Sequence, residues 1–131
     1  RNMKYDPNCR YDEEHEWIRV EGDEGVIGIS DYAQDQLSDI VYVELPEVGD
    51  VFDKGDVLAV VESVKAASDV FMPVTGEILE INELLEDSPE MVNQDPYGEA
   101  WLVRITIAEP AELDDLLDAG AYKSYVETLD E

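Results

Sequence analysis

Val60-Val61-Glu62-Ser63-Val64-Lys65-Ala66-Ala67-Ser68-Asp69-Val70 is the stretch of sequence that decides the fold. Apolar residues with high β propensity lie on each side of its centre, Leu58 to Val61 before it and Val70 to Met72 after it. This pattern predicts a hairpin of two strands joined by a tight turn. Lys65 then lies at the tip, where an enzyme can reach its side chain.

The sequence on either side of this hairpin repeats itself. Residues 46–58 align with residues 73–85 at a constant offset of 27, and Pro, Gly, an acidic residue, an aliphatic residue and a final Leu coincide. In this register Gly55 pairs with Asn82, the two residue types that most readily adopt left-handed backbone conformations, so both copies are expected to turn alike. Lys65 lies at the centre between the copies. Two similar β units around a lysine hairpin are typical of swinging-arm carriers acylated with lipoate or biotin.

Several blocks of the sequence carry a resemblance to a known family. They are His15-Glu16-Trp17, Gly28 to Gln34, Asp39 to Pro46, Glu62 to Ala66 and Asp95 to Leu102. Together they resemble the H protein family of the glycine cleavage system, a family of lipoyl carriers. A lone Val-Lys-Ala is weak evidence, whereas several blocks in the same order are strong evidence. The sequence departs from the family pattern at Ser38, where glycine usually closes the first helix, and at Ala100, where glycine is common.

The resemblance implies a mainly β fold, a lipoyl/biotinyl-type hybrid barrel-sandwich of two pseudo-symmetric β units with short helices. A chain of this length is expected to form one lipoyl-carrier domain over residues 1–131. The internal repeat then spans 46–85, and a C-terminal helical region spans 110–131. Residues 1–2 precede Met3 and are interpreted as residues left by cloning.

Local patterns predict further elements. Ser30 is expected to cap a short helix through Leu37, with Asp31 in its first turn. The apolar run Ile40–Leu45 predicts a buried strand. In the C-terminal region, leucines and tyrosines at spacings of three and four residues, interrupted near Gly120, predict helical contacts with the core.

Lys65 is the residue that the resemblance implies as the N6-lipoyl-lysine, with lipoate attached covalently. Glu62, Ser63, Val64 and Ala66 are the hairpin residues that a lipoylating enzyme is expected to recognise. The small side chains around the lysine leave room for such an enzyme to hold the turn.

A cleft that shelters the loaded arm is expected near His15, Glu16, Ser30 and Asp31, again as the resemblance implies. His15 is the only histidine, so it cannot form a multi-histidine metal site. We therefore predict no metal site and no catalytic residue in this chain.

The resemblance also implies the partners. The lipoyl arm is expected to carry an aminomethyl group from glycine decarboxylase (P protein) to aminomethyltransferase (T protein), and dihydrolipoyl dehydrogenase (L protein) then reoxidises the arm. A lipoate ligase or a lipoyl/octanoyl transferase attaches the cofactor. All of these reactions take place in partner active sites, so the chain is predicted to be a carrier protein and not an enzyme.

Other functions remain open from the sequence. An H-like protein that relays lipoyl groups to other complexes would use the same lysine. A lipoyl domain of a 2-oxo acid dehydrogenase complex is shorter and usually has Asp-Lys-Ala at the tip, and a biotinyl domain typically has Met-Lys-Met, whereas the flanks here are Val64 and Ala66. A plain interaction module would leave Lys65 unmodified.

The composition is strongly acidic, with 8 Lys and Arg against 34 Asp and Glu and a formal net charge of −26. This charge repels nucleic acids and anionic membrane surfaces, so neither is expected as a partner, and it attracts basic protein surfaces. It also suggests adaptation to salt. Cys9 is the only cysteine, so no intrachain disulfide can form. No apolar run approaches the ~20 residues of a membrane span, and a cytoplasmic location is expected.

Overall fold

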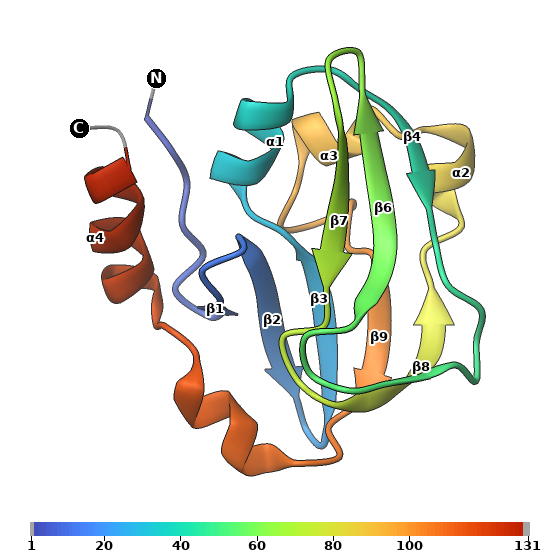
Figure 1. The fold of residues 1–131 in the computed structure, drawn as a ribbon, viewed down its shortest axis with the longest axis vertical. Helices are drawn as coiled ribbons and strands as arrows, with labels where there is room; N and C mark the ends of the chain where they lie inside the picture. Colours follow the sequence, from blue (N-terminus) through green and yellow to red (C-terminus); the bar gives the residue numbers. More distant parts are fainter. Residues whose placement is uncertain (1, 130–131) are drawn as a thin grey trace.

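The computed structural model describes residues 2–129, whose strands form two sheets (Figure 1). The larger sheet has the order β1 (Arg10–Tyr11), β2 (Glu16–Glu21), β3 (Glu24–Ile29), β9 (Val103–Thr106), β8 (Gly76–Ile81) and β5 (Val51–Phe52). The smaller sheet consists of β4 (Ile40–Glu44), β6 (Val57–Ser63) and β7 (Ala67–Phe71). The helices are α1 (Asp31–Leu37), α2 (Leu84–Asp87), α3 (Met91–Gln94), the 3-10 helix η1 (Pro110–Asp115) and α4 (Ala119–Leu129).

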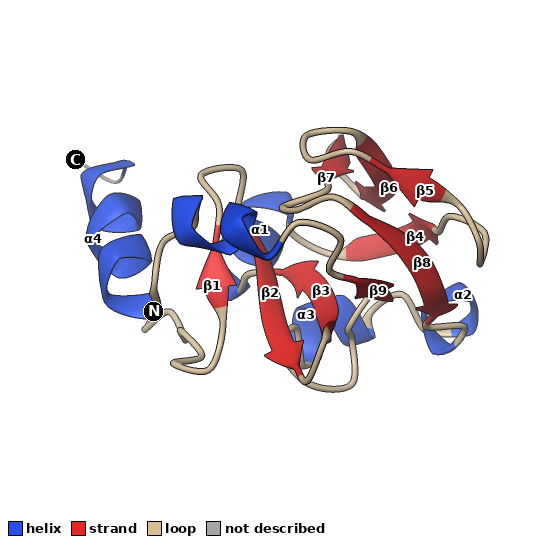
Figure 2. Ribbon diagram, turned by 90° about the horizontal axis from the view of Figure 1, so that it is seen from below, coloured by secondary structure: helices blue, strands red, loops and turns tan. Residues whose placement is uncertain are grey.

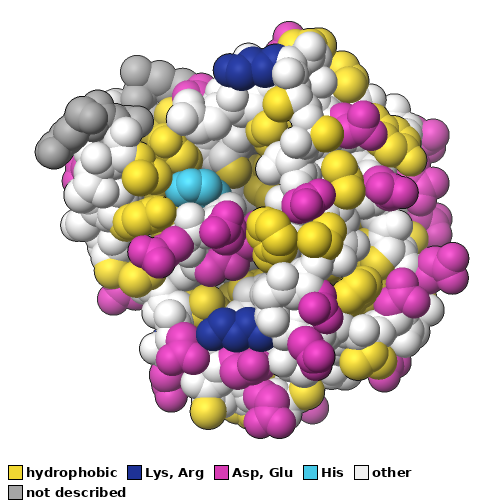
Figure 3. All heavy atoms as spheres, viewed as in Figure 1, with side chains coloured by type: hydrophobic (Ala, Val, Ile, Leu, Met, Phe, Trp, Pro, Cys, Tyr) yellow, Lys and Arg dark blue, Asp and Glu magenta, His cyan; other side chains and the backbone are white. Residues whose placement is uncertain are grey.

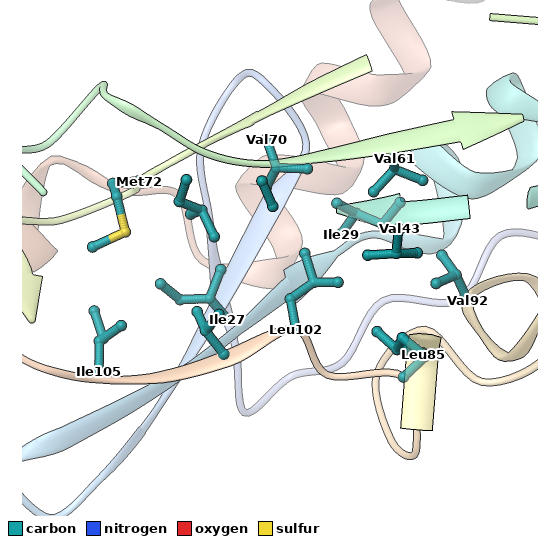
Figure 4. Packing of buried hydrophobic residues seen from close by; sticks show 14 of the residues in the cluster. Ile27, Ile29, Val43, Val61, Val70, Met72, Leu85, Val92, Leu102 and Ile105 are labelled. Atoms are coloured by element: carbon teal, nitrogen blue, oxygen red, sulfur yellow. The ribbon is translucent and has the colours of Figure 1, made fainter. Parts of the chain in front are cut away.

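The main core lies between the two sheets. Ile27 from the larger sheet points toward Val70 from the smaller one, and both are buried in one cluster with Ile105 and Val61 (Figure 4). Each such side chain contributes about 1.5–3 kcal/mol when it is removed from water. Over residues 2–129 the sheets remain open and do not close into a barrel. The expected mainly β class with short helices is confirmed.

The two copies of the sequence repeat meet where β5 pairs with β8. Val51 lies opposite Glu77, while the Ile78 N–H donates to the Asp50 carbonyl at 2.8 Å. In the repeat register Asp50 matches Glu77 and Val51 matches Ile78. Matching residues therefore exchange places across a local two-fold axis.

Gly55 and Asn82 do not turn in the same way, so that prediction was wrong. Gly55 has φ +91°, whereas Asn82 is not among the described residues with positive φ. Asn82 is buried, and its side-chain amide donates to the carbonyls of Glu99 at 2.8 Å and Trp101 at 2.7 Å. A buried amide must find hydrogen-bond partners, and these contacts determine the role of Asn82.

The strand β4 is only partly buried, contrary to the prediction from its apolar sequence. Ile40 and Val43 face the core, whereas Val41 and Tyr42 are 53% and 50% exposed. The strand lies at the edge of the smaller sheet, and its pairing with β6 shifts register between Ile40 and Tyr42. A bulge of this kind changes the direction of the side chains that follow it.

A second buried cluster joins the two ends of the chain. The rings of Tyr11 and Tyr122 stack at 4.3 Å, and Val126 packs in the same cluster. Figure 2 shows α4 at one end of the molecule beside the N-terminal segment. The helical region is interrupted at residues 116–118 and not at Gly120, which lies inside α4. No helix within residues 2–129 is long and apolar enough to cross a membrane.

Candidate functional site

Lys65 lies at the exposed tip of the hairpin formed by β6 and β7, at the upper end of the molecule in Figure 1. The strands pair in antiparallel register up to Glu62 and Ala67. The Ser63 N–H donates to the Ala66 carbonyl at 2.8 Å, which closes the turn. The hairpin predicted from the sequence is therefore present, and it presents the lysine to solvent.

The residues directly on either side of Lys65 are exposed, and most of the side chains in the turn are small. Val64 and Ala66 are exposed on either side, and Ala67 follows at the start of β7. The Val64 N–H donates to the Asp39 carbonyl at 3.0 Å, which ties the turn to the segment before β4. A modifying enzyme can thus approach the Lys65 amine without moving a large side chain.

A hollow of about 360 Å³ lies near the other end of β7. It is lined by Asp12, Glu14, Lys54, Gly55, Phe71, Met72 and Pro73. Lys65 lies in the turn and β7 runs from Ala67 to Phe71, so Lys65 and Phe71 are at most roughly 20 Å apart along the chain. A side chain extended from Lys65 along β7 therefore points toward this hollow.

Glu16 does not line the hollow but bonds to one of its lining residues, Phe71. Its side chain is only 1% exposed, and its Oε2 accepts the N–H of Phe71 at 3.1 Å. Its Oε1 has no hydrogen-bond partner among the described residues. Burial, and then a side-chain hydrogen bond with Asp12, raise the pKa of Glu16, so that its protonated form is favoured. A cationic group brought to Oε1 would favour the ionised carboxylate.

His15 has φ +75°, which sends its ring away from Glu16 and toward α4. Its Nδ1 lies 2.8 Å from the Tyr122 hydroxyl, and its ring also contacts Tyr32 and Tyr125. Burial lowers the pKa of the His15 imidazole. In Figure 3 the histidine (cyan) lies on the side of this face nearest α4, with acidic side chains (magenta) around exposed apolar ones (yellow). Its observed contacts are structural.

Ser30 and Asp31 are buried at the start of α1. The Ser30 hydroxyl accepts the Ala33 N–H at 3.1 Å, as predicted for a helix cap, and lies 2.7 Å from the Tyr122 hydroxyl. Asp31 accepts the Lys4 N–H and the Gln34 side-chain amide, each at 2.8 Å. These contacts serve the fold, and neither residue lines the hollow.

The sequence therefore identified only part of the group around the hollow. Of the expected cleft residues, Glu16 contacts a lining residue through its carboxylate. Asp12, Glu14, Phe71 and Met72 were missed. The sequence offered a clue to these residues, because Asp12 and Glu14 lie just before the His-Glu-Trp block, and Phe71 and Met72 lie at the far end of the lysine hairpin.

Two observations concern metal binding and thiol chemistry within residues 2–129. No group of three or more His, Cys, Asp or Glu side chains in this range could hold a metal ion. Cys9 is buried, and burial raises the pKa of its thiol to about 12. The thiolate is the reactive form of cysteine, so this thiol is unreactive at neutral pH.

Comparison with known proteins gives consistent matches. The family model described as Glycine cleavage H-protein matches residues 9–129. The glycine cleavage system H protein of Thermus thermophilus is 58% identical over 118 residues, covering 90% of this chain and 92% of the relative. That of Bacteroides thetaiotaomicron is 53% identical over 124 residues, covering 95% and 98%. The crystal structure of a glycine cleavage system H protein from Mycobacterium marinum superposes with a TM-score of 0.82 at 34% identity, covering 93% of this chain and 98% of that one.

Proposed function

Because the chain belongs to the glycine cleavage H-protein family, we propose that Lys65 is the residue to which lipoate is attached. The family consists of the lipoyl carriers of the glycine cleavage system, and the chain is such a carrier and not an enzyme. The observation that carries the proposal is the position of Lys65, exposed at the tip of the β6–β7 hairpin.

The hairpin fits a covalently attached acyl group. An exposed ammonium at a turn is inert until an enzyme converts it to an amide, and the small residues Ala66 and Ala67 leave space for that enzyme. When bound, lipoate supplies a disulfide that accepts the aminomethyl group from the P protein, passes it to the T protein and is reoxidised by the L protein. The chain itself contributes reach and presentation.

The hollow beside β7 is proposed as the resting place of the loaded arm. A lysine extended by an eight-carbon acyl chain spans about 16 Å, judged from ordinary bond lengths. Laid along β7, such an arm extends most of the way to Phe71. Contact with the hollow would cover part of the arm, and partial exclusion of water would slow hydrolysis of a reactive adduct.

The partners are proposed on the same basis. Family membership implies contact with the P, T and L proteins, and a lipoate ligase or lipoyl/octanoyl transferase is proposed as the modifying enzyme. The net charge of −26 favours docking to basic surfaces of these proteins. Glu62, Ser63, Val64 and Ala66 remain predicted recognition residues, and a cytoplasmic location remains a prediction.

The proposal is tested by measuring the intact mass of the protein after incubation with lipoate ligase, ATP and lipoate. Peptide mapping across Val57–Met72 then locates the modification. We expect a lipoyl-sized increase that is lost in Lys65→Ala and retained in Lys54→Ala, which removes the lysine in the turn before β6, at the opposite end of that strand from Lys65. An increase that persists in Lys65→Ala, or no increase in the wild-type protein, would overturn the proposal.

A further inference from the structure

Ser63 organises the turn that carries Lys65. Its Oγ accepts the backbone N–H groups of Lys65 at 3.1 Å and Ala66 at 3.0 Å, and it donates to the Ala66 carbonyl at 3.1 Å. A serine hydroxyl that bonds to the backbone two and three residues ahead stabilises a local turn. One side chain thus holds both peptide groups that flank the Lys65 Cα atom.

The turn has few other sources of rigidity. Val64, Lys65 and Ala66 are all exposed, so burial of their side chains contributes little. The other described contacts are two backbone hydrogen bonds, from the Ser63 N–H to the Ala66 carbonyl and from the Val64 N–H to the Asp39 carbonyl. Without the Ser63 hydroxyl, the N–H groups of Lys65 and Ala66 lose the acceptor that fixes their orientation.

We propose that Ser63 is a positioning residue for the modification of Lys65, because its hydroxyl holds the turn in the conformation that the modifying enzyme binds. The inference rests on the proposed function, in which Lys65 is the acylated residue. In that reaction the Lys65 amine attacks the carbonyl carbon of an acyl adenylate. The new N–C bond forms, the bond from the acyl carbon to the phosphate oxygen breaks, AMP leaves, and the amine loses a proton.

Ser63 acts here through Lys65 and not through contact with the reacting atoms. An enzyme that binds one conformation of a flexible turn has an apparent affinity reduced by the fraction of molecules in that conformation. Removal of the hydroxyl is therefore expected to raise KM and to leave kcat nearly unchanged. A residue that contacted the reacting atoms would instead lower kcat.

The test uses the unmodified full chain, a purified lipoate–protein ligase, ATP and lipoate. We expect Ser63→Ala to lower kcat/KM about tenfold, with nearly all of the change in KM. Ser63→Thr retains the hydroxyl and is expected to restore kcat/KM to within about threefold of the wild-type value. Ser68→Ala is the matched control, because Ser68 lies on the opposite strand and donates only to the Asp69 carbonyl at 3.5 Å.

A second measurement does not depend on activity. Amide hydrogen exchange at Lys65 and Ala66, followed by NMR, should be several-fold faster in Ser63→Ala and unchanged in Ser68→Ala. A kcat/KM within twofold of wild type in Ser63→Ala, a change confined to kcat, or unchanged exchange would overturn the inference. Absence of modification in the wild-type protein would instead refute the proposed function, so the two failures are distinguishable.

Discussion

Ser38 has a backbone conformation that glycine adopts readily and other residues do not. It follows α1 with φ +68° and ψ −153°. Its N–H donates to the Gln34 carbonyl at 3.1 Å, and its own carbonyl accepts the Asn93 side-chain amide at 2.9 Å. These backbone contacts hold the residue in place despite the strain, and glycine can make all of them.

We predict that Ser38→Gly stabilises the protein. A residue other than glycine in this region costs about 1–3 kcal/mol. Replacing Ser38 by glycine removes this strain, but it also makes the unfolded chain more flexible, which lowers the stability by about 0.5–1 kcal/mol. The side chain of Ser38 is exposed, so little packing is lost. The expected net gain in unfolding free energy is about 1 kcal/mol, which for a chain of this length raises Tm by about 4 °C.

The measurement is thermal and urea unfolding of the wild-type protein and three variants. Ser38→Ala keeps a Cβ atom at the same positive φ and should gain nothing. Ser88→Gly is the matched control, because Ser88 follows α2 with φ −133°, a conformation open to any residue. That variant should lose about 0.5–1 kcal/mol. Equal effects of glycine at positions 38 and 88, or no gain at position 38, would refute the strain argument.

Three further predictions concern buried polar groups and charge. Tyr122→Phe removes a hydroxyl that lies 2.8 Å from His15 Nδ1 and 2.7 Å from the Ser30 hydroxyl. It should lower the unfolding free energy, measured with urea, by about 1–3 kcal/mol, whereas Tyr125→Phe should lower it by under about 0.5 kcal/mol. Equal losses in the two variants would contradict this prediction. Burial raises the pKa of Glu16 above its ordinary 4.5, so the unfolded chain releases this proton at lower pH than the folded protein. The unfolding free energy of the wild-type protein should therefore fall relative to that of Glu16→Gln as pH rises above about 4.5, and parallel plots of unfolding free energy against pH would contradict this prediction. The unfolding midpoint should rise between dilute buffer and molar potassium chloride, because salt screens the net charge of −26, and a flat profile would rule out the salt adaptation.

The lysine hairpin was predictable because its determinants are local. Two apolar segments with high β propensity lie either side of a short polar turn, and the strands formed as expected at Val57–Ser63 and Ala67–Phe71. The cap of α1 by Ser30 was predictable for the same reason. In each case the interacting groups lie within a few residues of one another, so the sequence pattern already contains the contact.

The exposure of β4 was not predictable, since it depends on which strands become neighbours. Val41 and Tyr42 look like core residues in the sequence, but the strand has a partner on one side only and a bulge shifts its register. The prediction that Asn82 would turn like Gly55 was wrong for a similar reason, because the carbonyls to which the Asn82 amide donates lie on residues 99 and 101. Long-range contacts decide both positions, and a single sequence does not show them.

In the candidate site, too, long-range contacts decide what the local sequence does not show. Adjacent residues in the sequence were expected to share one cleft, yet the positive φ of His15 sends its ring toward α4 while the Glu16 carboxylate bonds to Phe71. Only a few per cent of residues other than glycine adopt such a backbone angle, and although histidine does so more often than most, nothing in the local pattern marks this one. The tyrosine cluster that receives the ring comes from the other end of the chain.

Two groups support the lysine turn: the Ser63 hydroxyl and the Asp39 carbonyl, which follows Ser38. Ser63 holds it from within, while the Asp39 carbonyl, one residue after the strained Ser38, holds it from outside through the Val64 N–H. If the greater freedom of glycine at position 38 loosens the Asp39 contact, and the two supports act independently, their effects on kcat/KM for lipoylation should multiply in the Ser38→Gly, Ser63→Ala double variant. A smaller combined effect would mean that both act on one conformational equilibrium. Because glycine at position 38 is expected to raise global stability, slower lipoylation in that variant would separate the rigidity of the turn from the stability of the fold.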